Sequence, residues 1–225
     1  MSLHLSQDLT DAHISLLKLS GSVEDMIASA VRSLVERRGA LAAEVIERDS
    51  QIDRSEVRIE EDCLKMLALH QPVAADLRRI TTMMKINNDL ERIADLACNI
   101  AQRADSLCPH PEFPIPPGIN EMASMTTSMV RRSLDSFVQR STDQARQVIE
   151  EDDRVDAKNV EVIETLNSLM SRDNSQIAAA MHCFSASRHL EQIADHAVSI
   201  AEDIIYMVDG EIVRHRQILQ RSNIT

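Results

Sequence analysis

The sequence contains no tryptophan and is poor in other aromatic residues, glycine and proline. Its 225 residues include one Tyr, three Phe, four Gly and six Pro. So few turn-forming residues argue against a β architecture, which needs many short strands joined by turns. The hydrophobic residues, 44% of the chain, are mainly aliphatic or Met, and with abundant Ala, Leu, Glu and Arg they favour long helices. The composition therefore predicts an all-α fold with a sizeable aliphatic core.

Positive charge is also scarce. The chain carries 24 basic and 36 acidic side chains, a formal net charge of −12, and both of its halves are net negative. Such a chain is repelled by the phosphates of nucleic acid and by an anionic membrane surface. We therefore expect it to bind cations or the basic faces of partner proteins, and we expect no nucleic-acid partner.

Long apolar runs and closely spaced cysteines are absent as well. No uncharged apolar stretch approaches the ~20 residues of a membrane span, and the first residues, MSLHLSQDLTDAH, lack a secretion-signal pattern. We expect a cytoplasmic protein without direct membrane insertion. The spacing of the cysteines favours buried free thiols, with a disulfide or a thiolate metal site as the alternatives. The four cysteines are Cys63, Cys98, Cys108 and Cys183.

Five of the six prolines gather in one stretch, CPHPEFPIPPGIN, which suggests a linker. It divides the chain into a first unit at residues 1–107, a Pro-rich linker at 108–118 and a second unit at 119–225. The two units repeat each other. LERIADLACNIAQ (90–102) returns as LEQIADHAVSIAE (190–202), with eight of thirteen positions identical.

A second pair of matching segments lies upstream, where AEVIERDSQID (43–53) returns as RQVIEEDDRVD (146–156). Each unit contains three stretches with helical spacing of apolar residues. Gly39, after two arginines, is read as the stop signal of the first helix, and Asp209-Gly210 as that of the last. The expected helices are roughly 6–38, 40–69, 74–106, 119–141, 143–172 and 175–208.

Short connections between such helices force antiparallel neighbours. The sequence thus predicts two tandem three-helix-bundle repeats, six long antiparallel helices in all, related by pseudo-two-fold symmetry. We expect the two units to be joined end to end by the Pro-rich linker.

The repeated segments carry pairs of acids at i and i+4, which share one face of a helix. Like charges at this spacing destabilise a helix by a few tenths of a kcal/mol. If neighbouring antiparallel helices bring two pairs together, four carboxylates converge in each unit. Such a cluster is either a solvated acidic face or a site for a hard cation such as Mg²⁺, Mn²⁺ or iron. The candidate ligands are Asp49, Asp53, Glu91 and Asp95, then Asp152, Asp156, Glu191 and Asp195, with His196 as an additional ligand.

Several motifs of metal and nucleotide enzymes are missing. No His has a Glu three residues before it, as di-iron carboxylate bundles require, and there is no HExxH, GxGxxG or GxxxxGK[ST]. The absence of these motifs favours a protein without catalytic turnover. A carboxylate-bridged metal enzyme and a metal-independent helical scaffold remain the alternatives.

At this point the motifs match a known family. LERIAD at 90–95, LEQIAD at 190–195, HQPVAADLRRI at 70–80 and IIYMVDGEIVRH at 204–215 together resemble the PhoU family of phosphate-signalling regulators, over essentially the whole chain. The resemblance implies a six-helix, two-repeat fold, often a homodimer. It also implies metal ions at the acidic motifs: iron, manganese or magnesium, with zinc as a further candidate.

The resemblance further implies a negative regulatory role. A family member links the ATPase subunit of a phosphate ABC importer to the sensor histidine kinase of the phosphate-starvation response, and would reach the inner face of the membrane through these partners. This chain departs from the family pattern in having Ala94 and Ala194 where Gly is common before the motif's Asp. Arg92 is matched by Gln192 in the second unit, so we expect two metal sites that are not equivalent.

Overall fold

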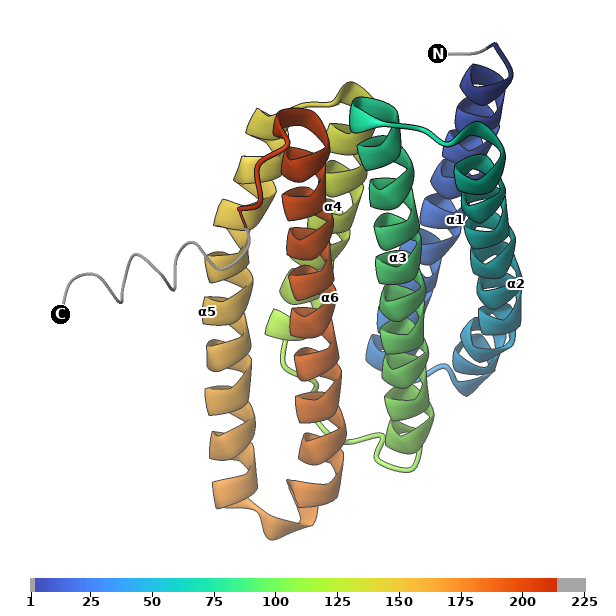
Figure 1. Cartoon of the computed structure of the whole chain (residues 1–225). Coiled ribbons are helices and arrows are strands. Elements are labelled where there is room, and N and C mark those ends of the chain that lie inside the picture. Colours follow the sequence, from blue (N-terminus) through green and yellow to red (C-terminus); the bar gives the residue numbers. More distant parts are fainter. Residues whose placement is uncertain (1–2, 214–225) are drawn as a thin grey trace, which may run out of the picture.

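The computed structural model describes residues 3–213 and is helical almost throughout (Figure 1). The described part contains six long α-helices, one short 3-10 turn and no β-strand. This confirms the all-α fold with three helices in each half. The elements are α1 (Leu3–Val35), α2 (Gly39–His70), α3 (Ala74–Leu107), α4 (Gly118–Gln139), α5 (Thr142–Arg172), η1 (Asn174–Gln176) and α6 (Ile177–Asp209).

Two predicted stop signals had different outcomes. Gly210 ends α6 as expected: its φ is +74°, and its N–H donates to the carbonyl of Tyr206 at 2.9 Å, as in an αL cap. The prediction that Gly39 ends the first helix was wrong. α1 already ends at Val35, the left-handed residue after it is Arg37 with φ 52°, and Gly39 is the first residue of α2.

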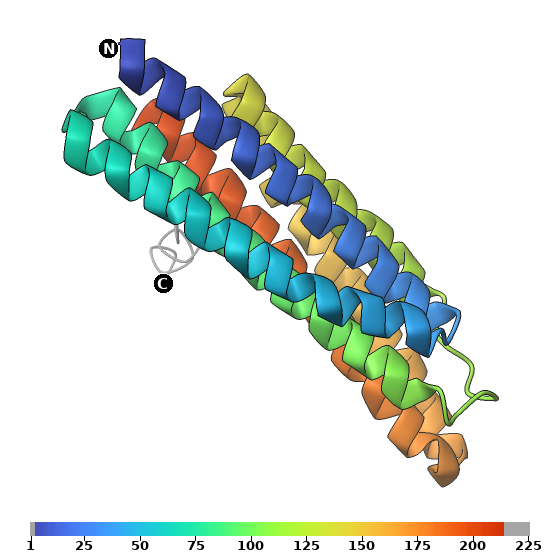
Figure 2. The same ribbon diagram turned by 90° about the vertical axis from the view of Figure 1, so that its right-hand side faces the viewer.

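The two three-helix units lie side by side along most of their length (Figures 1 and 2). α3 packs against α6, and α1 packs against α4. The expectation that the units are joined end to end was therefore wrong, because they pack against each other laterally. The reason is that α3 and α6 are buried on more than one side, so each needs apolar partners from both units. Fully buried alanines on these helices, such as Ala97 and Ala197, allow neighbouring helix axes to approach closely.

The repeat is visible in the burial pattern. Buried residues of α1 correspond to buried residues of α4 at an offset of 103 positions, as Leu16 corresponds to Ile119 and Met26 to Met129. The same offset relates α2 to α5, as Ile52 corresponds to Val155. An offset of 103 therefore relates matching positions of α1 to α4 and of α2 to α5.

The connection from α3 to α4 is non-helical over residues 108–117 and contains most of the predicted linker. The exact unit boundaries at 107 and 119 stay a prediction. Residues 214–225, with the end of the second unit and of the 204–215 motif, lie outside the described residues. In the part that the structure describes, no helix has the length and apolarity to cross a membrane.

All four cysteines are free, as predicted; three of them are buried, but Cys108 is exposed, contrary to the expectation. Burial is the main reason why the pKa of each buried thiol rises to about 12. These thiols therefore stay protonated at neutral pH and pack as small apolar groups. The buried three are Cys63, Cys98 and Cys183.

Candidate functional site

The structure brings the acids of the first unit together between α2 and α3. Asp49 and Asp53 lie on α2, and Asp95 lies on α3. The pKa of Asp49 is raised above its usual value, first by burial and then by the charges of Asp53 and Asp95, while a hydrogen bond with Cys98 opposes the shift. A carboxylate on one helix thus feels the charges of both helices.

Glu91 belongs to the same cluster. Burial raises its pKa most, followed by the charge of Asp95, and Asp53 of α2 contributes as well. Arg92 partly offsets this repulsion, because its Nε lies 3.4 Å from Glu91 Oε2 and its Nη1 lies 3.4 Å from Asp95 Oδ2. Its side chain is 56% exposed, so solvent screens both ion pairs and each contributes little.

The second unit repeats the arrangement between α5 and α6 with greater repulsion. Burial, followed by the charges of Asp156 and Asp195, raises the pKa of Asp152 from 3.8 to about 6. The pKa values of Glu191 and Asp195 are also raised, in both cases mainly by burial and then by neighbouring charges that include Asp156. All eight predicted acids therefore form two groups of four, one in each unit.

The two clusters are not equivalent. Gln192 takes the place of Arg92, so the position that bridges the two acids in the first unit is neutral in the second. Arg188, one turn earlier, contacts Glu191 and opposes the rise in its pKa. Asp152, whose pKa rises to about 6, lies on α5, whereas this arginine lies on α6.

Two buried amides accompany the clusters and were not found from the sequence. Asn87 of α3 is 1% exposed and donates to the carbonyl oxygen and the Oε1 of Glu56, at 2.9 and 3.0 Å. Asn159 of α5 is 3% exposed. The side-chain oxygens of both amides have no hydrogen-bond partner within residues 3–213. The available signal was spacing, since Asn87 precedes Glu91 by four residues.

The ring of His196 lies across the seam between the units. Its Nδ1 is 2.9 Å from Asp89 Oδ1, which joins α6 of the second unit to α3 of the first. His196 also contributes a charge effect that lowers the pKa of Asp195. Its role as an additional metal ligand stays a prediction, and the bond to Asp89 gives it a structural role as well.

The donor atoms of both clusters suit a hard cation. Carboxylate and amide oxygens are the ligands that Mg²⁺, Mn²⁺ and iron accept, and two of the amide oxygens are buried without a partner. In their present rotamers, no three His, Cys, Asp or Glu side chains among residues 3–213 converge enough to hold one ion. Ion binding would therefore require carboxylate side chains to turn toward one another.

Comparison with known proteins identifies the family that shares this architecture. Residues 16–104 and 119–204 each match the family model described as the PhoU domain. The chain belongs to the PhoU family. It is 40% identical to the phosphate-specific transport system accessory protein PhoU homolog of Aquifex aeolicus, covering 96% of this chain and 98% of the relative. It is 38% identical to the homolog of the same name from Pseudomonas aeruginosa, over 94% of this chain and 90% of that protein.

Solved PhoU structures share the fold. The crystal structure of PhoU from Pseudomonas aeruginosa superimposes with a TM-score of 0.87 at 37% identity, covering 92% of this chain and 99% of that one. The structure described as the phosphate transport system regulatory protein PhoU from Streptococcus pneumoniae gives a TM-score of 0.86 at 25% identity, covering 93% and 99%. The two-repeat fold is therefore that of PhoU proteins.

The raised pKa of Asp152 predicts a pH dependence in the metal-free protein. Ionising this acid costs the folded state more than the unfolded state, so stability falls as pH rises from about 4 to about 6. Asp152→Asn removes this cost and should stabilise the protein by about 1 kcal/mol at pH 7, after allowing for solvent screening. Near pH 4 the gain should nearly vanish. Urea unfolding with chelator present, at several pH values, measures both.

Glu164→Gln is the matched control for this prediction. Glu164 lies on the same helix, is exposed and forms no ion pair within the described part of the chain. Its substitution should leave stability unchanged within about 0.5 kcal/mol at every pH. A gain from Asp152→Asn that is equal at pH 4 and pH 7, or a loss at pH 7 with chelator present, would contradict the account.

Proposed function

We propose that this protein is a non-catalytic regulator of phosphate uptake. The observation that carries the proposal is the extent of the similarity. It runs through both repeats, and the relatives that it covers almost completely are named accessory proteins of the phosphate-specific transport system. A likeness over both units supports a shared role for the whole molecule, because neither unit is replaced by a different module.

In this role the protein represses uptake and the phosphate-starvation two-component response while phosphate is plentiful. It does so as a cytoplasmic adaptor between the ATPase subunit of the phosphate ABC importer and the sensor histidine kinase, and it reaches the inner membrane face through them. It acts as a homodimer. The net charge of −12 supports partners with basic surfaces, since complementary charge speeds encounter and suppresses wrong partners.

The carboxylate clusters bind metal ions in this proposal. Asp49, Asp53, Glu91 and Asp95 hold cations between α2 and α3, and their counterparts in the second unit hold cations between α5 and α6. A bound divalent or trivalent ion supplies positive charge that cancels the repulsion among the acids. The support is the raised pKa values, the hard oxygen donors and the unpartnered amide oxygens. The counterparts are Asp152, Asp156, Glu191 and Asp195.

A metal-independent helical scaffold is the second candidate function. It is favoured by Arg92, which bridges Glu91 and Asp95 without any metal, and by the absence of three converging ligands within residues 3–213. In this alternative the acids form a surface that recognises basic partner residues directly. The two candidates differ in what chelation does to the protein.

The regulatory role predicts a clear phenotype. Deleting the gene should switch on phosphate-starvation genes in cells that have ample phosphate, because the repressing contact between importer and kinase is lost. Transcript levels of those genes, before and after complementation with the wild-type gene, measure this. Starvation genes that stay off in the deletion strain would exclude the role for this protein.

The metal proposal predicts that each of two substitutions changes the melting temperature differently with metal and with chelator. With Mn²⁺, Mg²⁺ or Fe²⁺ present, Asp95→Asn and Asp195→Asn should each lower the melting temperature, because binding stabilises only the folded state. With chelator, the same changes relieve repulsion and should leave it equal or higher. Elemental analysis and thermal melts measure this. Protein purified without chelator or affinity tag that holds no metal, and that gains no stability from any of these ions, would favour the scaffold.

A further inference from the structure

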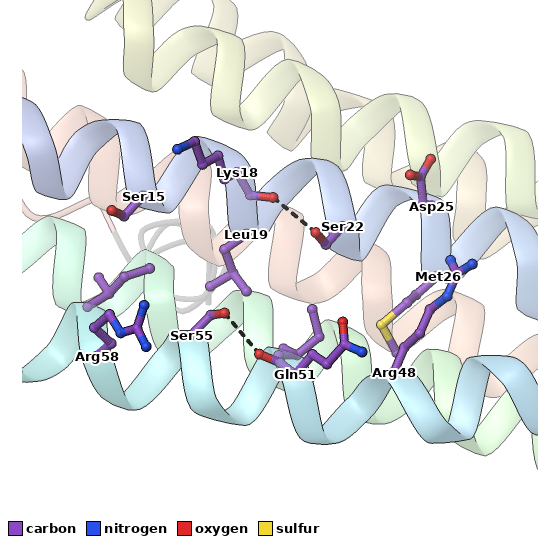
Figure 3. Close-up of a pocket in the computed structure, with 12 residues that line it drawn as sticks. Ser15, Lys18, Leu19, Ser22, Asp25, Met26, Arg48, Gln51, Ser55 and Arg58 are labelled. Atoms are coloured by element: carbon purple, nitrogen blue, oxygen red, sulfur yellow. Dashed lines mark hydrogen bonds between the residues drawn. The ribbon is translucent and has the colours of Figure 1, made fainter.

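A hollow between α1 and α2 carries the opposite charge from the rest of the molecule (Figure 3). Its volume is about 430 Å³, within the size range of small-molecule sites. Lys18 of α1 and Arg48 and Arg58 of α2 line it, against a single lining carboxylate, Asp25. A local excess of basic residues in a chain with net charge −12 calls for an explanation.

None of the three basic residues is neutralised by the protein. Lys18, Arg48 and Arg58 are exposed, and none forms an ion pair within the described part of the chain. Figure 3 shows Arg48 and Arg58 rising from α2 toward α1 at opposite ends of the hollow, with Gln51 between them. α2 thus presents carboxylates to α3 on one side and free cations to α1 on another.

The corresponding surface of the second unit, between α4 and α5, carries the opposite charges. At the offset of 103 residues, each basic residue of the first groove corresponds to an acid between α4 and α5. The charge is reversed at all three positions. Lys18 corresponds to Glu121, Arg48 to Glu151 and Arg58 to Glu161.

Ion pairs neutralise these acids of the second unit. Lys158 binds Glu121 at 3.0 Å and Glu161 at 2.6 Å. Glu151 is paired with Arg132 and with Arg154, the latter at 3.7 Å. Each of these three acids therefore has a cationic partner from the chain, and Glu121 and Glu161 share Lys158.

The first groove has no such internal partners. The positions that correspond to the three pairing cations hold neutral side chains, namely Ser29, Gln51 and Ser55. The positions that supply pairing charges in the second unit are therefore neutral in the first. A groove with cations left unpaired in this way is suited to an external anion.

We propose that the groove between α1 and α2 is a binding site for an oligophosphate. Arg48 and Arg58 are ten residues apart on one helix, about 15 Å along its axis, so one phosphate centre would not occupy both ends. The apolar floor offers little to a peptide, because Ile52 and Ile59 are only 3% and 2% exposed. The guanidinium groups bind phosphate oxygens by bidentate hydrogen bonds. The Gln51 amide supplies a donor between them.

Calorimetric titration of the full-length protein tests the site. The ligands are inorganic tripolyphosphate, ATP, orthophosphate and a short polyglutamate peptide, in about 150 mM salt. EDTA keeps cations off the carboxylate clusters, so that no metal can bridge the ligand to them. We expect saturable binding of tripolyphosphate or ATP with Kd below about 1 mM, and weaker binding of orthophosphate. Tighter binding of tripolyphosphate would identify an inorganic phosphate chain as the ligand, whereas tighter binding of ATP would identify a nucleotide.

Two pairs of variants locate the binding. Arg48→Gln with Arg58→Gln should weaken tripolyphosphate binding by about tenfold or more, because two charge-assisted contacts are lost. Arg54→Gln with Arg172→Gln changes the net charge equally at exposed positions that do not line the hollow, and should weaken binding less than about threefold.

Four results would overturn the proposal. They are no saturable binding, equal loss in both variant pairs, orthophosphate binding as tightly as the longer anions, and groove-dependent binding of polyglutamate more tightly than tripolyphosphate. The last result would assign the groove to an acidic protein segment. Because the experiment concerns a different face from the carboxylate clusters, its failure leaves the proposed regulatory function untouched.

Discussion

The packing of α3 against α6 is the contact on which the rest of the molecule depends. Each of these helices buries apolar residues toward its own unit and also toward the other, so neither unit presents a finished surface without its neighbour. Leu90 and Ile193 illustrate this, since both are fully buried although Leu90 adjoins Glu91 and Ile193 lies two residues from Glu191. The seam makes one core from two repeats, and it leaves α2 and α5 as the outer helices.

This arrangement makes ionisation of the acids unfavourable. Burial of α3 and α6 draws Glu91 and Glu191 partly out of water, while the outer helices bring further carboxylates against them. Neighbouring carboxylates, after burial, contribute to the raised pKa values in both clusters. The first cluster eases this with Arg92. The second shows its strain in the raised pKa of Asp152.

The sequence predicted most of the fold because long amphipathic helices and a repeated motif leave few alternatives. Helix ends agreed within about three residues, except that Gly39 was misread: either side of a two-helix connection can hold a glycine, and the left-handed residue was Arg37. The side-by-side packing could not be predicted, since it depends on which helices are buried on several sides. The acids were found by their i,i+4 spacing, whereas Asn87 and the His196–Asp89 bond depend on contacts between helices that no spacing reveals.

Our central proposal is that each unit holds a carboxylate cluster where cations bind, one between α2 and α3 and one between α5 and α6. Crystals grown with Mn²⁺ and measured for anomalous scattering test it most directly, because the map shows where each ion lies. The account predicts a peak at each cluster, with Asp195→Asn weakening the peak between α5 and α6 and sparing the other. Crystals containing Mn²⁺ with no peak at either cluster, or with peaks only elsewhere on the molecule, would contradict it.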